Sequence, residues 1–296
     1  MCYKDTKSKE ILAENFPDIL KKSKFCPSKL YVKGMELSQD MVGVAMVGTR
    51  RPSPSAPLLC DLLVKSLMGT KAVVISGLAP GIDSFCHNAA LKYKIPTIAV
   101  MGQGLETLIS GSRGDLANQI LKEGGSLISA FEDQVTAAKW TFPLRNKIIA
   151  GLAHATIVVE SKIKGGALLT AEHVLKDNRL LLSVPGDFNR ETAAGCNALL
   201  KTGKAKALFD PSDFALYAGL STKNDEKNIE FSKRHLNLSK EAQELWKESS
   251  AFTFTLDELQ EKFSFKAHLL LAILTELEIA GVVHSNDFIR YHFAKW

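Results

Sequence analysis

Residues 72–83, Ala-Val-Val-Ile-Ser-Gly-Leu-Ala-Pro-Gly-Ile-Asp, decide the fold class of this chain. The apolar, β-branched run at 73–75 is typical of a strand buried on both faces of a parallel sheet. The strand ends at Ser76, and Pro80 is expected to open a helix that continues to Tyr93, since a first helical turn needs no partner for that backbone nitrogen. A strand, a glycine turn and a helix favour an anion through free amides and the helix dipole, although the glycines alone are equally consistent with a plain turn.

The same strand–turn–helix pattern is repeated along the chain. Further strands are expected at 41–47, 97–101, 126–130, 155–160 and 180–184, and further helices at 58–67, 115–122, 144–152 and 167–176. Regular alternation of strands and helices predicts right-handed crossovers. The sequence therefore predicts an α/β fold with a doubly wound parallel sheet of an extended Rossmann-like kind.

Composition divides the chain into four segments. Residues 1–40 form a polar lead-in with a small helix and an edge strand, and residues 41–219 form the Rossmann-like domain. Residues 220–238 are charged and poor in apolar side chains, as expected of a linker. Residues 239–296 are expected to form a small C-terminal winged-helix domain of three helices and a hairpin, with a capping box, Thr-Leu-Asp-Glu, at 255–258.

Charge and cysteine usage limit the class of protein. The 296 residues carry a formal net charge of +5, which is compatible with a nucleic-acid partner without proving one. The five cysteines are scattered and never form a CxxC pair, which argues against disulfides and a zinc site and for a reducing cytoplasm. Because no apolar run is long enough to span a membrane and no signal-peptide core is present, we expect a cytoplasmic protein without a membrane partner.

Polar and glycine-rich segments follow several of the expected strands. In an open α/β sheet the carboxyl ends of the strands share one edge, and ligands bind there. This edge would collect several helix N-termini and the cations Arg50, Arg51, Arg145, Lys147 and Lys164. Arginine offers bidentate contacts to phosphate and lysine offers a point charge, so the sequence predicts a site for a polyanion.

The motifs of several enzyme classes are missing from the sequence. Gly-Gln-Gly at 102–104 lacks the third glycine of a dinucleotide site, and no P-loop, GxSxG elbow or HExxH motif occurs. Asp83 and Glu160 lie near the expected site and could act as acid or base, but such carboxylates more often hold a glycine turn or pair with an arginine. The sequence therefore indicates no catalytic residue, no metal ligand and no cofactor.

Several motifs occur in an order that resembles one bacterial family. They are Gly-Thr-Arg (48–50), Ser-Gly-Leu-Ala-Pro-Gly-Ile-Asp (76–83), Phe-Pro-Leu-Arg-Asn-Lys (142–147), Gly-Gly-Ala-Leu-Leu-Thr-Ala (165–171), Val-Pro-Gly (184–186) and Gly-Cys-Asn (195–197). From about residue 16 to 209 this order resembles the DNA-processing protein A family, also called Smf. The resemblance implies a non-enzymatic protein that binds single-stranded DNA as a homodimer, protects incoming strands in natural transformation and loads the RecA recombinase.

The resemblance also implies roles for individual residues. It assigns Arg50, Arg145 and Lys147 to phosphate groups, and it leaves Phe142 either stacked on a base or in the core. Glycines for close backbone approach and polar side chains for hydrogen bonds complete the expected DNA-binding set: Gly48, Thr49, Arg51, Gly77, Asn146, Lys164, Gly165, Gly166, Thr170 and Asn197. The homodimer is expected near the carboxyl end of the Rossmann-like domain, at apolar residues that could equally be core: Leu199, Leu200, Leu208 and Phe209.

The chain departs from the family pattern in places, and two other classes stay open. Lys147 stands where arginine is usual, and the amino-terminal helical domain of many members is not recognised. The first alternative is a nucleotide-processing enzyme such as a nucleoside-monophosphate phosphoribohydrolase, whose Pro-Gly-Gly-x-Gly-Thr-x-x-Glu signature is approached at 164–172 without the third glycine. The second is a protein-interaction scaffold.

Overall fold

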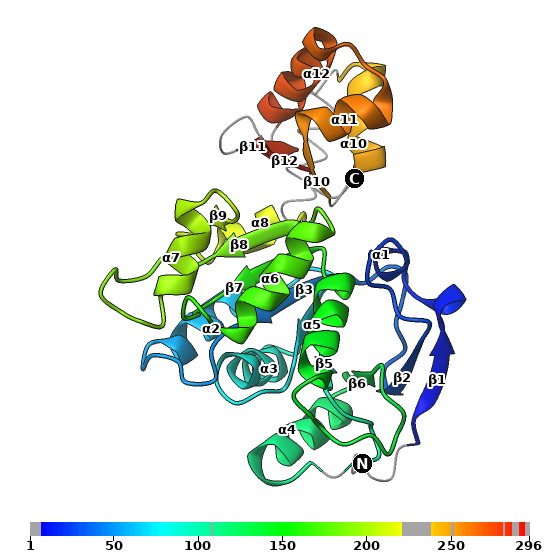
Figure 1. Ribbon diagram of the computed structural model, residues 1–296, viewed down its shortest axis with the longest axis vertical. Helices are drawn as coiled ribbons and strands as arrows, with labels where there is room; N and C mark the ends of the chain where they lie inside the picture. The colour runs from blue at the N-terminus through cyan, green and yellow to red at the C-terminus, as the bar shows by residue number, and fades with distance from the viewer. Residues whose placement is uncertain are drawn as a thin grey trace.

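The computed structural model (Figure 1) describes residues 7–107, 109–220, 238–249, 252–280, 282–285 and 290–293. Of the predicted linker at 220–238, only the two end residues fall within these ranges, so the linker itself lies outside the described residues.

The described chain is built on a nine-stranded sheet with the order β1-β2-β6-β5-β4-β3-β7-β8-β9. In the sheet order from β6 through β5, β4, β3, β7 and β8 to β9, neighbouring strands pair in parallel. At the opposite end of the sheet, β1 pairs antiparallel with β2, and β2 pairs antiparallel with β6. Their bounds are β1 (Lys9–Leu12), β2 (Lys29–Gly34), β3 (Val42–Val47), β4 (Ala72–Ser76), β5 (Thr97–Val100), β6 (Ser126–Ser129), β7 (Ala155–Val158), β8 (Leu180–Ser183) and β9 (Lys206–Ala207). The predicted doubly wound parallel sheet is confirmed.

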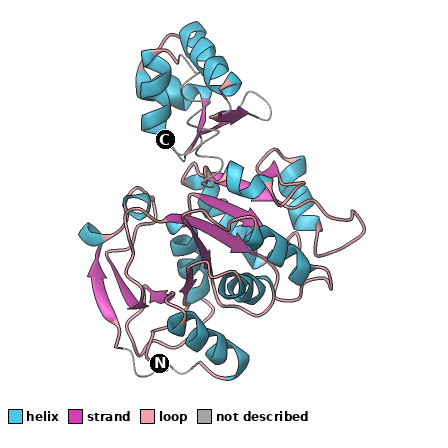
Figure 2. Cartoon of the chain, turned by 180° about the vertical axis from the view of Figure 1, so that it is seen from behind, coloured by secondary structure: helices cyan, strands magenta, loops and turns pink. Residues whose placement is uncertain are grey.

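Helices cover both faces of this sheet, as the two opposite views show (Figure 1 and Figure 2). One face packs against α1 (Asp18–Lys21), α5 (Thr141–Leu152), α6 (Gly166–Lys176) and α7 (Ala194–Lys201). The other face packs against α2 (Ala56–Lys65), α3 (Ile82–Lys92), α4 (Gly111–Lys122) and α8 (Asp213–Tyr217). Every position of β3, β4, β5, β7 and β8 is buried, which explains why these strands read as continuous apolar runs rather than alternating ones.

Several predicted boundaries were wrong. Strand β2 was expected at the edge of the sheet, but β1 pairs with its outer side and is itself the edge strand. This pairing satisfies the backbone N–H and C=O groups that β2 would otherwise leave unpaired. Helix α3 begins at Ile82 rather than Pro80, since Gly81 is the N-cap residue and holds a φ of +86°. A Cβ at Gly81 would come within 2.5 Å of the Thr49 carbonyl oxygen, so the turn demands glycine there. Helix α4 begins at Gly111, four residues earlier than expected, and neither β9 nor α8 was predicted.

His87 is fully buried in α3 and is a core residue. Its Nδ1 lies 2.7 Å from Thr97 Oγ1, and the Thr97 hydroxyl donates its own proton to the Val74 carbonyl. Nδ1 must therefore carry the ring proton, which leaves Nε2 buried without a hydrogen-bond partner in the described structure. Burial, reinforced by the positive charge of Arg145, lowers the pKa of His87 to about 3.

We expect His87 to make folding sensitive to acid. Above about pH 6.5 the ring is neutral in both states, so this group adds no pH dependence. As the pH falls from about 6.5 toward 3, the unfolded chain binds a proton that the folded chain refuses, and the free energy of unfolding falls. Between pH 7 and pH 4.5 the wild type should lose about 2 to 3 kcal/mol more than His87→Asn, whose amide can still reach Thr97. Urea unfolding of both proteins measures this difference, and equal losses would contradict it.

Arg179 joins the N-terminal segment to the end of α5. This side chain is 1% exposed, and its Nη1 donates to the carbonyl oxygens of Ala150 (2.8 Å) and Ala153 (3.0 Å), while its Nη2 donates to that of Ile19 in α1. The neighbouring Asp177 is also buried and accepts hydrogen bonds from Ser23 Oγ and the Lys24 amide. Carbonyl groups at the C-terminal end of α5 thus receive hydrogen bonds from one buried cation.

The described part of the C-terminal tail contains three helices and a small antiparallel sheet. The elements are α10 (Lys240–Ser249), β10 (Thr253–Thr255), α11 (Leu256–Phe263), α12 (Ala267–Ile279), β11 (Val283–Ser285) and β12 (Arg290–Phe293), with the strand order β10-β12-β11. The predicted capping box is confirmed: the Glu258 amide donates to Thr255 Oγ1, and the Thr255 amide donates to Glu258 Oε2. Strand β10 was not predicted, and the winged-helix assignment of this tail stays a prediction.

Glu258 also connects the tail to the larger domain. Its Oε1 accepts a hydrogen bond of 3.0 Å from Asn178 Nδ2, next to Arg179, and the Thr253 amide donates to the Asn178 carbonyl.

Across the described ranges, no helix is both long and apolar enough to cross a membrane.

Candidate functional site

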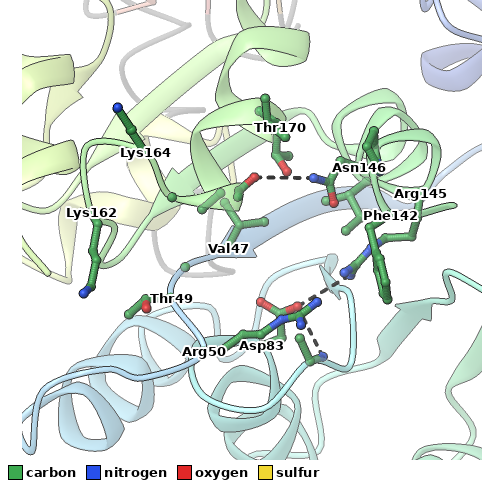
Figure 3. A pocket seen from close by; sticks show the side chains of 18 of the residues that line it. Val47, Thr49, Arg50, Asp83, Phe142, Arg145, Asn146, Lys162, Lys164 and Thr170 are labelled. Atoms are coloured by element: carbon green, nitrogen blue, oxygen red, sulfur yellow. Dashed lines mark hydrogen bonds and ion pairs between the residues drawn. The ribbon is translucent and has the colours of Figure 1, made fainter. Parts of the chain in front are cut away.

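A cavity of about 750 Å³ lies at the carboxyl edge of the sheet, where β3 is flanked by β4 and β7. The chain leaves β3 toward β4 on one side and later enters β7 on the other, so this is the topological switch point at which open α/β sheets bind ligands. Most of the predicted DNA-binding residues line the cavity: Gly48, Thr49, Arg50, Phe142, Arg145, Asn146, Lys164, Gly165, Gly166 and Thr170 (Figure 3).

Arg145 forms the floor of this cavity. It projects from the first turns of α5, is only 6% exposed, and its Nη1 lies 3.5 Å from Asp83 Oδ2. The same Asp83 oxygen accepts hydrogen bonds from the amides of Gly77 (3.2 Å) and Ala79 (3.4 Å). The expectation that Asp83 holds the glycine turn and pairs with an arginine is confirmed. Nε of Arg145 is buried without a hydrogen-bond partner in the described chain, and Nη1 has the Asp83 carboxylate as its ionic partner.

Burial acts on both members of this pair. It raises the pKa of Asp83, against the lowering effect of Arg145 and of the two backbone amides. It also lowers the pKa of Arg145, and Asp83 opposes that shift. Asp83 and Arg145 are each only 6% exposed, so the pair is poorly solvated. An incoming anion would therefore interact with Arg145 in surroundings that screen its charge weakly.

Gly77 leaves room for the Arg145 guanidinium. A Cβ at this position would overlap Nη1 of Arg145 and come within 2.8 Å of Asp83 Oδ2. The backbone of Gly77 does not have a positive φ, so the need for glycine comes from the neighbouring side chain rather than from the turn geometry. Gly77 itself does not line the cavity. The structure thus gives Gly77 a packing role beneath Arg145, and its close approach to DNA stays a prediction.

We expect Gly77→Ala to weaken anion binding through Arg145. The added methyl group must displace the guanidinium, and the affinity for single-stranded DNA should fall by about tenfold. A double-mutant cycle tests the mechanism: in an Arg145→Ala background the same substitution should have little further effect. Additive losses in affinity would show that Gly77 acts independently of Arg145.

Arg50 and Phe142 form the wall beside this floor. The guanidinium carbon of Arg50 lies 5.2 Å from the centroid of the Phe142 ring, and that of Arg145 lies 6.0 Å from it. Arg50 is exposed and Phe142 is half-buried. The ring thus lies near two cations and still reaches the cavity, so of its two predicted roles the geometry allows stacking as well as packing.

The opposite wall is formed by the loop after β7 and the start of α6. Gly165 is the N-cap residue of α6, and no side chain caps this helix, so its first amides are available to an anion. Lys162 and Lys164 are exposed on the same loop (Figure 3), and Lys162 pairs with Glu191 at 2.7 Å. Asn146 Nδ2 donates to the Gly166 carbonyl at 3.4 Å, which connects this wall to α5.

Glu160 supports the loop after β3 instead of facing a ligand. It is 2% exposed, accepts hydrogen bonds from the Ser53 amide (2.9 Å) and hydroxyl, and lies 3.9 Å from Arg190 Nη1. Its own carbonyl accepts the Thr49 amide at 2.8 Å. The expectation that this carboxylate has a structural role is confirmed.

Other predicted residues lie outside the cavity lining. Lys147 sits on another side of α5, where its Nζ is 5.2 Å from the centroid of the Phe25 ring. Asn197 makes two hydrogen bonds to the backbone of Gly186, at 2.9 and 3.2 Å, and so holds the turn after β8. Arg51 is exposed beyond Arg50 and does not reach the cavity. The structure therefore does not bring Arg51, Lys147 and Asn197 to the site.

Sequence reasoning missed three cations near this edge. Lys139 and Lys162 line the cavity directly, and Arg113 approaches from α4, where its Nε donates to the Leu78 carbonyl at 2.9 Å. Lys162 precedes Lys164 in the same loop and could have been included on that ground. Arg113 could not have been included among the predicted site residues, because α4 was expected to begin after this residue. Among the described residues, no group of three or more potential metal ligands occurs.

Comparison with known proteins places the chain in a family. A family model described as DNA recombination-mediator protein A matches residues 9–218. DNA processing protein DprA of Bacillus subtilis is 34% identical over 204 residues, which cover 69% of this chain and 68% of that protein. Protein Smf of Escherichia coli is 34% identical over 191 residues, which cover 64% of this chain and 51% of that protein, so the match spans about half of that relative.

Two solved structures share the fold. The X-ray structure of DNA processing protein A from Streptococcus pneumoniae has a TM-score of 0.64 at 30% identity and covers 71% of this chain and 74% of its own. A structure of DNA processing protein A from Helicobacter pylori, reported for its single-stranded DNA binding mode, has the same TM-score at 26% identity and covers 71% of this chain and 95% of its own. Sequence, fold and the order of motifs along the cavity agree, and the chain belongs to the DNA recombination-mediator protein A family.

Proposed function

We propose that this protein acts in DNA processing as a non-enzymatic binder of single-stranded DNA, and that the cavity at the switch point holds the phosphate backbone. The observation that carries the proposal is the buried Arg145, which lines the cavity beside an uncapped helix N-terminus and whose Nε has no hydrogen-bond partner within the described chain. Buried polar groups are otherwise almost always paired, so this arrangement is suited to an anionic ligand. The reported binding mode of the Helicobacter pylori relative supports the choice of a single strand.

The phosphate site is combined with an aromatic ring. Phe142 reaches the cavity next to Arg50, and single-strand binders use such rings to stack bases irrespective of sequence. Titration of labelled oligothymidylate and of a duplex of the same length, at several salt concentrations, tests the proposal. We expect tighter binding of the single strand and an affinity that falls with salt. Equal affinity for both forms would contradict it.

A nucleotide-processing enzyme is the second candidate, and the structure disfavours it. In the phosphoribohydrolase signature the glutamate follows the glycines by a fixed interval, and the nearest equivalent here is Glu172. Glu172 is exposed on α6 and does not line the cavity, while Asp83 is engaged by Arg145 and two amides. Incubation with nucleoside monophosphates should therefore release no free base, and release of base would support the enzyme.

The proposal extends to assembly and to a protein partner. Among the four apolar residues expected at a homodimer interface, Leu208 is 3% exposed and belongs to the core, whereas Phe209 is 81% exposed beside the edge strand β9. We infer a homodimer in which Phe209 is covered, and light scattering of wild type and Phe209→Asp tests it. A RecA-loading role in the cytoplasm during natural transformation rests on the family resemblance, and RecA filament formation on protein-coated single strands would measure it.

A further inference from the structure

Arg113 is a cation at the same sheet edge as the cavity, but it does not line the cavity. It lies in the first turn of α4, the helix that follows β5, and its Nε donates to the Leu78 carbonyl at 2.9 Å. Leu78 adopts a left-handed φ of +56° in the turn between β4 and α3. Arg113 is therefore attached to the turn by backbone geometry and not by an acidic partner.

The turn at 77–81 thus connects two cations through its backbone groups. On one side the amides of Gly77 and Ala79 donate to Asp83, which also pairs with Arg145. On the other side the Leu78 carbonyl receives Nε of Arg113. Within the described residues this is the one hydrogen bond assigned to the Arg113 guanidinium, so its two terminal nitrogens retain their donors for another acceptor.

Charge is not balanced around this turn. Arg50, Arg113 and Arg145 surround a single carboxylate, Asp83. Partial burial lowers the pKa of Arg113, the positive charge of Arg50 lowers it further, and Asp83 raises it. The arginines therefore repel one another in the absence of a ligand, and a second negative charge beside Arg113 would relieve that repulsion.

The order of the strands gives the length of the cationic track. Arg113 follows β5, the turn at 77–81 follows β4, Arg50 follows β3, and Lys162 and Lys164 follow β7. Because the Arg113 guanidinium is bonded to the turn after β4, the track runs from β4 through β3 to β7, and two strand spacings, or about 10 Å, separate its ends. Phosphates along one strand of a duplex are about 3.4 Å apart along the axis, so the track is longer than one phosphate requires.

We propose that Arg113 forms a second phosphate subsite, outside the cavity and above the turn at 77–81, which binds another phosphate of the same single strand as the one held by Arg145. The proposal rests on the proposed function, because it extends that site by one phosphate. Its ligand is a phosphodiester of a polynucleotide, and a mononucleotide seated in the cavity would leave the subsite empty.

The test compares probes of different length on Arg113→Gln. For oligothymidylate we expect affinity to fall by about tenfold and the log–log salt slope to decrease by roughly 0.7. For thymidine 5′-monophosphate, followed by NMR titration, we expect no change. Lys122→Gln is the matched control, because it removes one exposed cation from the far end of the same helix and should leave both probes unaffected. Arg113→Lys should restore the salt slope, since the charge remains.

The outcomes separate the two proposals. The second subsite would be overturned if Arg113→Gln and Lys122→Gln had the same salt slope for oligothymidylate. It would also be overturned if Arg113→Gln lost equal affinity for oligothymidylate and for thymidine 5′-monophosphate. In both cases, binding of oligothymidylate by the wild type would still support the proposed function. A wild-type protein that fails to bind oligothymidylate would overturn the proposed function itself. Thermal unfolding of each variant establishes that it is folded, and Arg113→Lys keeps the comparison valid if Arg113→Gln is unstable.

Discussion

Arg145→Ala is expected to lower the affinity for single-stranded DNA by about tenfold or more and to reduce the free energy of unfolding by about 3 kcal/mol. Affinity falls because the cavity loses the buried cation on its floor, and charge-assisted contacts to phosphate are the strongest it can make. Stability falls because Asp83 loses its ion-pair partner while staying buried.

A matched control for this prediction is available on the same helix. Lys147→Ala also removes one positive charge, two residues further along α5, but Lys147 lies against Phe25 and outside the cavity. A salt titration should show a slope reduced by roughly 0.7 for Arg145→Ala and a nearly unchanged slope for Lys147→Ala. If Arg145→Ala and Lys147→Ala reduce the salt slope equally, the net charge of the protein and not the buried site governs binding. A stably folded Arg145→Ala with unaltered slope would remove Arg145 from the phosphate contacts.

Arg179→Met is expected to reduce the free energy of unfolding by about 3 to 5 kcal/mol. The substitution keeps much of the volume but removes the donors that satisfy the Ala150, Ala153 and Ile19 carbonyl groups, and it leaves Asp177 buried without the nearby cation. Because these carbonyls lie at the C-terminus of α5 and in α1, we expect the N-terminal segment to detach first.

Denaturant unfolding measures this effect, and Lys176→Met is its control. Lys176 is an exposed cation three residues before Arg179, so its removal should change stability by less than about 0.5 kcal/mol. Burial lowers the pKa of Arg179 to about 10, yet the side chain stays charged at neutral pH. A loss as small as that of the control would mean that the described hydrogen bonds contribute little to stability.

The sequence alone determined the class of fold and the edge of the sheet at which the site lies. Continuous apolar runs at β3 and β4 can be satisfied only by burial on both faces, which requires a parallel sheet covered by helices. Glycine turns after those strands then bring helix N-termini to one edge. The structural roles of Asp83 and Glu160 were also predictable, because a carboxylate beside glycine turns and arginines has local partners to satisfy.

Only the tertiary structure decided which cations reach the cavity. Arg145 and Lys147 are two residues apart, so they point about 200° apart around α5, and only packing against the sheet decides which of them faces inward. Arg113 is brought to Leu78 by the crossover that connects β5 to α4, across 35 residues of sequence. The space that Gly77 leaves for Arg145 arises in the same way, from an element that joins the turn only after the sheet has formed. Local patterns fix strands, helices and turns, whereas the phase of a helix and contacts between distant segments depend on how the whole sheet is packed.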